Sequence, residues 1–177
     1  MFPKAHAAAY VMSAIRLAWY KIYHAKEFYA AFLSVASNGF DAEVVSGGLP
    51  SIARKMEEIE EKQKKKEATA NDDAQHAILL LVREAILRGV KFLPIDLYKS
   101  HSRYFLPEAE GIRMPFLALA GLGDTVANKI VEVREEGEIF SVEELRRKAG
   151  LSKTIVELLR SRGVFGGLQE TDQYSLF

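Results

Sequence analysis

The sequence has no cysteine, which excludes disulfide bonds and thiolate metal sites. It has no net charge at pH 7, because 24 Lys and Arg residues balance 24 Asp and Glu residues. A contact with nucleic acid must therefore depend on local geometry or a local charged patch, and not on the charge of the whole molecule. Long apolar runs are also missing, since Arg16 interrupts the most apolar early stretch well short of the ~20 residues that span a bilayer. No signal peptide is visible, so we expect a cytoplasmic protein without membrane contact.

Hydrophobic residues nevertheless make up 49% of the 177 residues and charged residues 27%, which is ordinary for a globular protein with one domain or two small ones. Apolar residues recur at three- and four-residue steps in four stretches, which predicts a mainly α fold. The predicted helices cover residues 7–23, 26–37, 51–67 and 71–88. The third carries a thin apolar stripe of Ile52, Met56 and Ile59, and Asn71 or Asp72 is suited to cap the fourth.

Residues 90–115 contain three prolines and no helical period, which predicts an extended connector with one or two short strands. Beyond it, short helices alternate with glycine-containing turns. We therefore divide the chain into a helical segment (1–105), a connector (106–114), a second helical domain (115–166) and a tail (167–177).

The most informative spacing lies in the second domain, at Gly121-Leu122-Gly123. A short apolar helix over Phe116 to Leu119 precedes it, and a second helix is expected to begin at Asp124 or Thr125. Two glycines allow a tight turn with positive φ. The exposed N–H groups at the start of the following helix form an anion site that suits a phosphate.

The same arrangement returns at Gly150-Leu151-Ser152, where Ser152 can cap the next helix and Lys153 would lie beside a phosphate. Between the copies, Ser141 and Glu144 form the pattern of a capping box. This pair of turns resembles the tandem helix-hairpin-helix motif, which holds duplex DNA by its phosphates without reading the sequence. The candidate phosphate-binding residues are Gly121, Leu122, Gly123, Thr125, Gly150, Ser152 and Lys153. The alternative is that each turn only connects two packed helices.

Acidic residues surround both turns and predict a modest affinity for DNA. They are Glu132, Glu135, Glu136, Glu143 and Glu144.

The start of the chain carries a second resemblance. The run AHAAAY (residues 5–10) resembles the late fingers segment of bacterial replicative polymerases of the C family. The resemblance implies that Lys4, His6 and Tyr10 face the triphosphate of the incoming nucleotide or the template–primer. Without the resemblance, Lys4 and His6 would be taken as ordinary exposed residues near the start of a helix.

The order of these motifs, ending in QYSLF at residues 173–177, is similar to that of the PolC-type alpha subunits of DNA polymerase III. The resemblance covers essentially the whole chain and implies the carboxy-terminal part of a longer polypeptide. One departure is Ala120, where the family usually has proline. The resemblance further implies that Gln173, Ser175, Leu176 and Phe177 bind the sliding clamp (the beta subunit). The stretch FGGLQETD (residues 165–172) fits a flexible tether, with Gly166-Gly167 for reach. The alternative is a tail that folds back onto the second hairpin.

No catalytic constellation is recognisable in the sequence: we find no cluster of carboxylates, no metal-ligand spacing of the four histidines and no phosphate-binding loop of the GxxxxGK type. We therefore expect an inactive fragment of a DNA-directed DNA polymerase with no cofactor of its own. By resemblance, the Mg²⁺ of the full polymerase would be bound outside this chain. The expected partners are double-stranded DNA, the sliding clamp and the rest of the polymerase chain. A subunit of a DNA-repair nuclease and a helical adaptor that binds only proteins are the alternatives.

Overall fold

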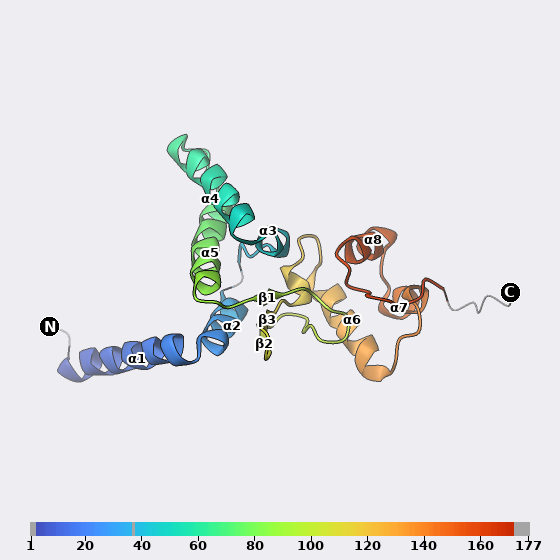
Figure 1. The fold of residues 1–177 in the computed structure, drawn as a ribbon, viewed down its shortest axis with the longest axis horizontal. Coiled ribbons are helices and arrows are strands. Elements are labelled where there is room, and N and C mark those ends of the chain that lie inside the picture. The colour runs from blue at the N-terminus through green and yellow to red at the C-terminus, as the bar shows by residue number, and fades with distance from the viewer. Residues whose placement is uncertain (1–2, 37, 172–177) are drawn as a thin grey trace.

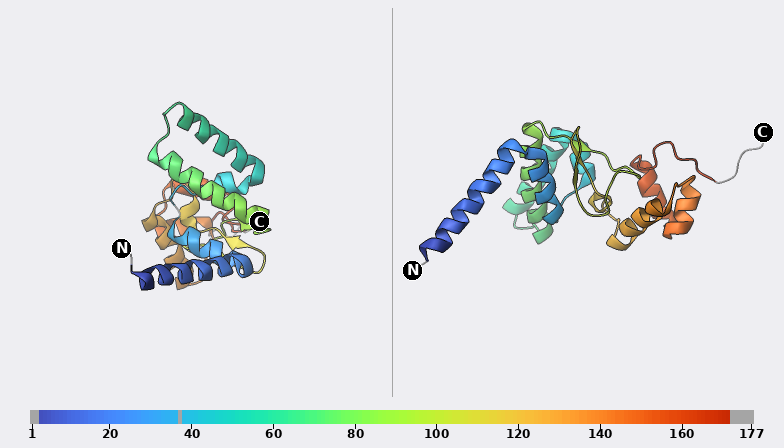
Figure 2. Two further views of the ribbon diagram at one scale, coloured as in Figure 1. Left: turned by 90° about the vertical axis from the view of Figure 1, so that its left-hand side faces the viewer. Right: turned by 90° about the horizontal axis from the view of Figure 1, so that it is seen from below.

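The computed structural model describes residues 3–36 and 38–171, and these form an elongated, mainly helical molecule (Figure 1). The mainly α prediction is confirmed. The helices of the first half are α1 (Lys4–Tyr23), α2 (Ala25–Val35), α3 (Ala42–Ser46), α4 (Gly48–Lys64) and α5 (Ala70–Leu87). Helix α1 extends away from the rest of the molecule at one end, and none of its residues is buried (Figures 1 and 2). Its last turn is attached by an ion pair of 2.8 Å between Lys21 and Glu84 of α5.

Helices α4 and α5 form a hairpin whose contact is the predicted apolar stripe. Ile52, Met56 and Ile59 are buried in α4, as expected. They belong to the same core as Ile78 and Val82 of α5.

The cap of α5 differs from the prediction, because it is Thr69 and not Asn71 or Asp72. The Thr69 hydroxyl accepts the N–H of Asp72 at 3.2 Å, and the Asp72 carboxylate accepts the N–H of Thr69 at 2.8 Å. This reciprocal box satisfies two N–H groups, whereas a cap at residue 71 or 72 would satisfy one. The Thr69 hydroxyl also donates to the Asp72 carboxylate at 2.7 Å. This bond, followed by those from the Thr69 N–H and from Lys62, lowers the pKa of Asp72 to about 2.

Residues 90–115, called the connector from here on, contain three very short strands where one or two were expected. They are β1 (Phe92–Leu93), β2 (Leu106–Pro107) and β3 (Ile112–Arg113). Strand β3 lies in the centre, parallel to β1 and antiparallel to β2. Gly111 permits the close approach of β3 to β1, because a Cβ there would lie 2.4 Å from the carbonyl oxygen of Lys91.

The connector packs on both of its neighbours. The N–H of Phe105 donates to Ser34 of α2 at 2.9 Å, and the N–H of Leu97 donates to the carbonyl of Val164 at 3.2 Å. Buried apolar residues on either side belong to one continuous core. The boundary at 106–114 stays a prediction, but it does not correspond to a gap in packing.

The second half contains a single turn of 3₁₀ helix, η1 (Phe116–Ala118), followed by α6 (Asp124–Glu136), α7 (Val142–Ala149) and α8 (Lys153–Ser161). Leu122 and Leu151, at the centres of the two turns, are both buried, and Ala127 and Ile130 of α6 are fully buried. Figure 2 shows these helices gathered at the end of the molecule opposite to α1.

Candidate nucleic-acid interface

The first hairpin (residues 116–136) turns at Gly121, whose φ of 90° lies in the left-handed region that favours glycine. Gly123 has a φ of −87°, so the expectation that both glycines use positive φ is wrong for this position. The element before the turn is a 3₁₀ turn and not the expected short helix. Its first N–H groups bind the connector, since Phe116 donates to the carbonyl of His101 and Leu117 to that of Ser102, each at 3.0 Å.

The start of α6 is exposed, and its N–H groups are available. Within residues 3–36 and 38–171, no acceptor is found for the N–H groups of Gly123, Asp124 and Thr125. Gly121, Gly123 and Thr125 lie at the surface. Leu122 differs from them, because its side chain is buried and its N–H donates to Leu119 at 3.1 Å. Leu122 therefore serves the turn and not the exposed surface.

A negative charge lies directly at this start of α6. The Asp124 carboxylate pairs with Arg103 of the connector at 3.0 Å, and both side chains are more than half exposed. The turn that carries Arg103 is ordered by His101, whose Nδ1 accepts the N–H groups of Arg103 and Tyr104 at 3.0 and 3.1 Å. Burial, followed by the nearby charge of Arg134, lowers the pKa of His101, which favours the neutral ring that these bonds require. Arg103 lies outside the hairpin, so the motif did not point to it.

The second hairpin (residues 141–163) follows the predicted geometry closely. Gly150 has a left-handed φ of 66°, and the Ser152 hydroxyl caps α8 by accepting the N–H of Ile155 at 3.2 Å. The N–H groups of Gly150 and Leu151 both donate to the carbonyl of Arg146, so the turn itself uses them. Those of Ser152, Lys153 and Thr154 have no acceptor in the part of the chain that the structure describes. Gly150, Ser152 and Lys153 are exposed.

Glu144 is buried and fully engaged at the start of α7, so it is not a free acid beside the second turn. Its N–H donates to Ser141 at 3.0 Å, as the capping pattern predicts, and its carboxylate accepts the N–H of Phe140 at 2.8 Å. The same carboxylate pairs with Lys148 at 2.7 Å. The bond from Lys148, followed by that from Phe140, lowers the pKa of Glu144.

The start of the predicted tether is bound to the second hairpin. The N–H of Val142 donates to the carbonyl of Gln169 at 2.8 Å, and that of Glu143 donates to Glu170 at 3.1 Å. The expectation of a flexible tether is therefore wrong at these two positions. Their carbonyls satisfy N–H groups that the first turn of α7 would otherwise leave unpaired.

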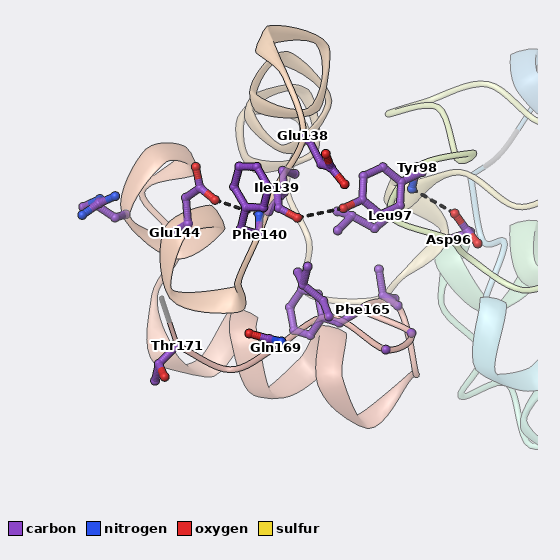
Figure 3. Close-up of a pocket in the computed structure, with 15 residues that line it drawn as sticks. Asp96, Leu97, Tyr98, Glu138, Ile139, Phe140, Glu144, Phe165, Gln169 and Thr171 are labelled. Atoms are coloured by element: carbon purple, nitrogen blue, oxygen red, sulfur yellow. Dashed lines mark hydrogen bonds between the residues drawn. The ribbon is translucent and has the colours of Figure 1, made fainter. Parts of the chain in front are cut away.

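A hollow of about 740 Å³ lies between this bound segment, the loop before α7 and the connector (Figure 3). The Tyr98 hydroxyl donates across it to the carbonyl of Ile139 at 3.1 Å. Phe140, Phe165 and Gln169 also line it, but none of the predicted phosphate-binding residues does.

The remaining candidates are not brought to the hairpins. Lys4, His6 and Tyr10 lie in the exposed first turns of α1. The rings of His6 and Tyr10 pack edge to face, with 4.6 Å between their centroids. Figure 1 places α1 and the pair α7–α8 at opposite ends of the long axis. Gln173, Ser175, Leu176 and Phe177 lie outside the described residues. Over residues 3–36 and 38–171, no cluster of three potential metal ligands occurs, and no helix has the length and apolar character needed to cross a membrane.

Comparison with known proteins agrees with this geometry. A family model described as "Helix-hairpin-helix motif" matches residues 89–174, so the match begins in the connector and includes both hairpins. Among curated proteins, the chain is 47% identical to "DNA polymerase III PolC-type" of Streptococcus sanguinis (strain SK36). It is 46% identical to that of Streptococcus suis (strain 98HAH33) and 45% identical to that of Streptococcus pneumoniae (strain ATCC BAA-255 / R6). Each comparison covers 100% of this chain but only 12% of the relative. The family resemblance that the motifs indicated is thereby confirmed: over its whole length, the chain is related to one segment of PolC-type DNA polymerase III.

Proposed function

We propose that this chain holds duplex DNA for a replicative polymerase, without reading its sequence, and ties that polymerase to its sliding clamp. The observation that carries the proposal is the pair of turns at Gly121 and Gly150. Each precedes a helix whose first N–H groups are exposed and find no acceptor among the residues that the structure describes. Backbone N–H groups at a helix start bind phosphate oxygens, which are the same in every sequence. The match to the helix-hairpin-helix family supports this use of the two turns.

The polymerase itself is part of the proposal, since the chain spans only 12% of its relatives. We propose that α1 packs against a part of the polymerase chain outside these 177 residues. Val11, Ile15, Trp19 and Ile22 recur on one face of α1 and are between 47% and 64% exposed. A continuous exposed apolar face of this kind marks a contact with another protein surface. In this arrangement Lys4, His6 and Tyr10 contact the nucleotide or the template–primer, as the family resemblance implies.

The clamp contact would be made by Gln173, Ser175, Leu176 and Phe177. Burying Leu176 and Phe177 in a preformed cleft would contribute roughly 1.5–3 kcal/mol for each side chain. The proposed peptide begins three residues after Glu170, whose carbonyl accepts the N–H of Glu143 of α7. A weak peptide contact gains strength when DNA holds the same molecule nearby.

The test is the binding of a short fluorescein-labelled duplex, followed by anisotropy, together with incubation of supercoiled plasmid in Mg²⁺. We expect saturable duplex binding at low salt and an intact plasmid. An absence of duplex binding would favour an adaptor that binds only proteins. A metal-dependent nick would favour a repair nuclease, and either result would contradict the proposal.

A further inference from the structure

The two hairpins differ sharply in charge. The first hairpin, residues 116–136, has two basic residues against four acidic ones, a net charge of −2. The second, residues 141–163, has six basic residues against three acidic ones, a net charge of +3. Because phosphate contacts are electrostatic, this difference matters more for DNA than the zero net charge of the whole chain.

Both cations of the first hairpin are already engaged. Lys129 pairs with Glu132 at 2.6 Å on the surface of α6. Arg134 donates to the carbonyls of Leu97 and Ser100 at 3.0 and 2.7 Å, which fixes α6 to the connector. The carboxylate of Asp124 stands at the exposed start of α6, where a phosphate would have to approach.

The second hairpin has cations to spare. Within the described ranges, neither Arg146 nor Lys153 forms an ion pair or a side-chain hydrogen bond, and both are exposed. They line a shared hollow of about 270 Å³ between α7 and α8. Arg146 also lines a second hollow, of about 440 Å³, that reaches Gly150 and Leu151 in the turn.

We infer that the second hairpin is the principal phosphate-binding unit, with Arg146 and Lys153 as its cationic contacts. The inference rests on the proposed function and assigns most of the phosphate binding to the second turn. The unpaired N–H groups of Ser152 to Thr154 lie at the start of α8, which Lys153 itself opens. Arg146 lies on the helix before the turn and approaches the same phosphate backbone from α7. The first hairpin packs the domain and contributes a weaker contact. Arg146 was not among the sequence-based candidates.

The test compares neutral variants of matched cations in the 177-residue chain: Arg146→Gln, Lys153→Gln and their combination, with Lys129→Gln as the control in the first hairpin. Arg146→Lys retains the charge and serves as a second control. Duplex affinity is measured by anisotropy over a range of salt concentrations, and folding by circular dichroism. We expect the double variant to lose at least tenfold in affinity. Its slope of log affinity against log salt should fall by roughly two, since each phosphate contact contributes about 0.9. The duplex affinity of Lys129→Gln should stay within about twofold of the parent's, because Lys129 is already paired with Glu132.

If Lys129→Gln and Arg146→Gln lose duplex affinity equally, or if the salt slope of the double variant is unchanged, the second hairpin is not the principal phosphate-binding unit. Either result would leave DNA binding by the chain intact. If Arg146→Gln unfolds, the comparison of Lys153→Gln with Lys129→Gln decides the same question. A parent chain that binds no duplex at low salt would instead refute the proposed function, and this inference with it.

Discussion

Arg103 and Asp124 form an ion pair of 3.0 Å at the first residue of α6, directly beside the exposed N–H groups at the start of that helix. The carboxylate favours the helix, because it lies at the positive end of the helix dipole. It disfavours a phosphate in the same place. The pair thus favours the start of α6 only modestly, since both side chains are more than half exposed, and it opposes the binding of an anion there.

The first prediction follows from this pair. Asp124→Asn removes the negative charge but leaves an amide at the start of α6, so we expect duplex affinity to rise by a few-fold, on the order of one charge interaction at the surface. Arg103→Gln should lower the duplex affinity, because the negative charge of Asp124 then loses its partner. Anisotropy titrations of the two variants at one low salt concentration provide the measurement. A fall in affinity on Asp124→Asn would show that the carboxylate helps the DNA complex.

The two glycines of the first turn should respond differently to the same substitution. Gly121→Ala places a Cβ on a residue with φ 90° and should cost about 1–2 kcal/mol in the free energy of unfolding. Gly123 has φ −87°, and a Cβ there would meet no atom within 4 Å, so Gly123→Ala should be nearly neutral. Urea unfolding of both variants compares them. Equal destabilisation would mean that the turn needs both glycines.

The cap of α5 predicts a dependence of stability on pH. Thr69→Ala should cost about 1 kcal/mol through the lost cap. The pKa of Asp72 is depressed to about 2 in the folded chain, so its contribution is present above the pKa of ~3.9 in the unfolded chain and is lost as the pH falls toward 2. Thermal unfolding between about pH 4 and pH 2 should therefore be less pH-dependent in Asp72→Asn than in the parent. If the thermal stability of Asp72→Asn and that of the parent change equally with pH, the contribution of Asp72 to the capping box is contradicted.

Two truncations separate the roles of the tail. Removal of residues 173–177 should abolish binding to the sliding clamp and leave both duplex affinity and stability unchanged. Removal of residues 168–177 should in addition destabilise the second hairpin, because α7 loses the carbonyls of Gln169 and Glu170. Surface plasmon resonance on immobilised clamp and thermal unfolding are the two readouts. Normal clamp binding by the shorter truncation would refute the assignment of the tail.

The exposed face of α1 predicts self-association in the isolated chain. Ile15 is 64% exposed and Trp19 47% exposed, on the same face of the helix. Ile15→Lys should therefore reduce oligomers without lowering the thermal stability, because α1 contributes no buried residue to the core. Sedimentation velocity measures the change. A monomeric parent chain would argue against an apolar contact surface on α1.

The sequence predicted the helices well because their apolar residues recur with helical spacing, as Ile52, Met56 and Ile59 illustrate in α4. Helix α3 was missed, since it spans only Ala42–Ser46 and its one local signal is the cap at Asp41. The three strands are two residues long and show no alternation that a sequence pattern could reveal.

Within the candidate interface, the turns at Gly121 and Gly150 were correctly placed, because glycine is the residue that a left-handed φ requires. The different φ of Gly123 could not be read from the sequence, since glycine is compatible with either conformation. The significance of Arg146 was missed for another reason. Two acids stand one turn before these cations on α7, and among the described residues Lys148 pairs with Glu144 while Arg146 does not pair with Glu143, a difference that the charge pattern alone does not reveal. The bound Mg²⁺ of the full polymerase, the cytoplasmic location and the clamp contact stay predictions.

The central claim is that the chain binds duplex DNA through its phosphates. The most direct measurement is the affinity of the 177-residue chain for two duplexes of unrelated sequence, each titrated over a range of salt concentrations. We expect measurable binding at low salt, nearly equal affinities for the two duplexes, and the same linear fall of log affinity with log salt. No binding at low salt, or a strong preference for one sequence with little dependence on salt, would contradict it.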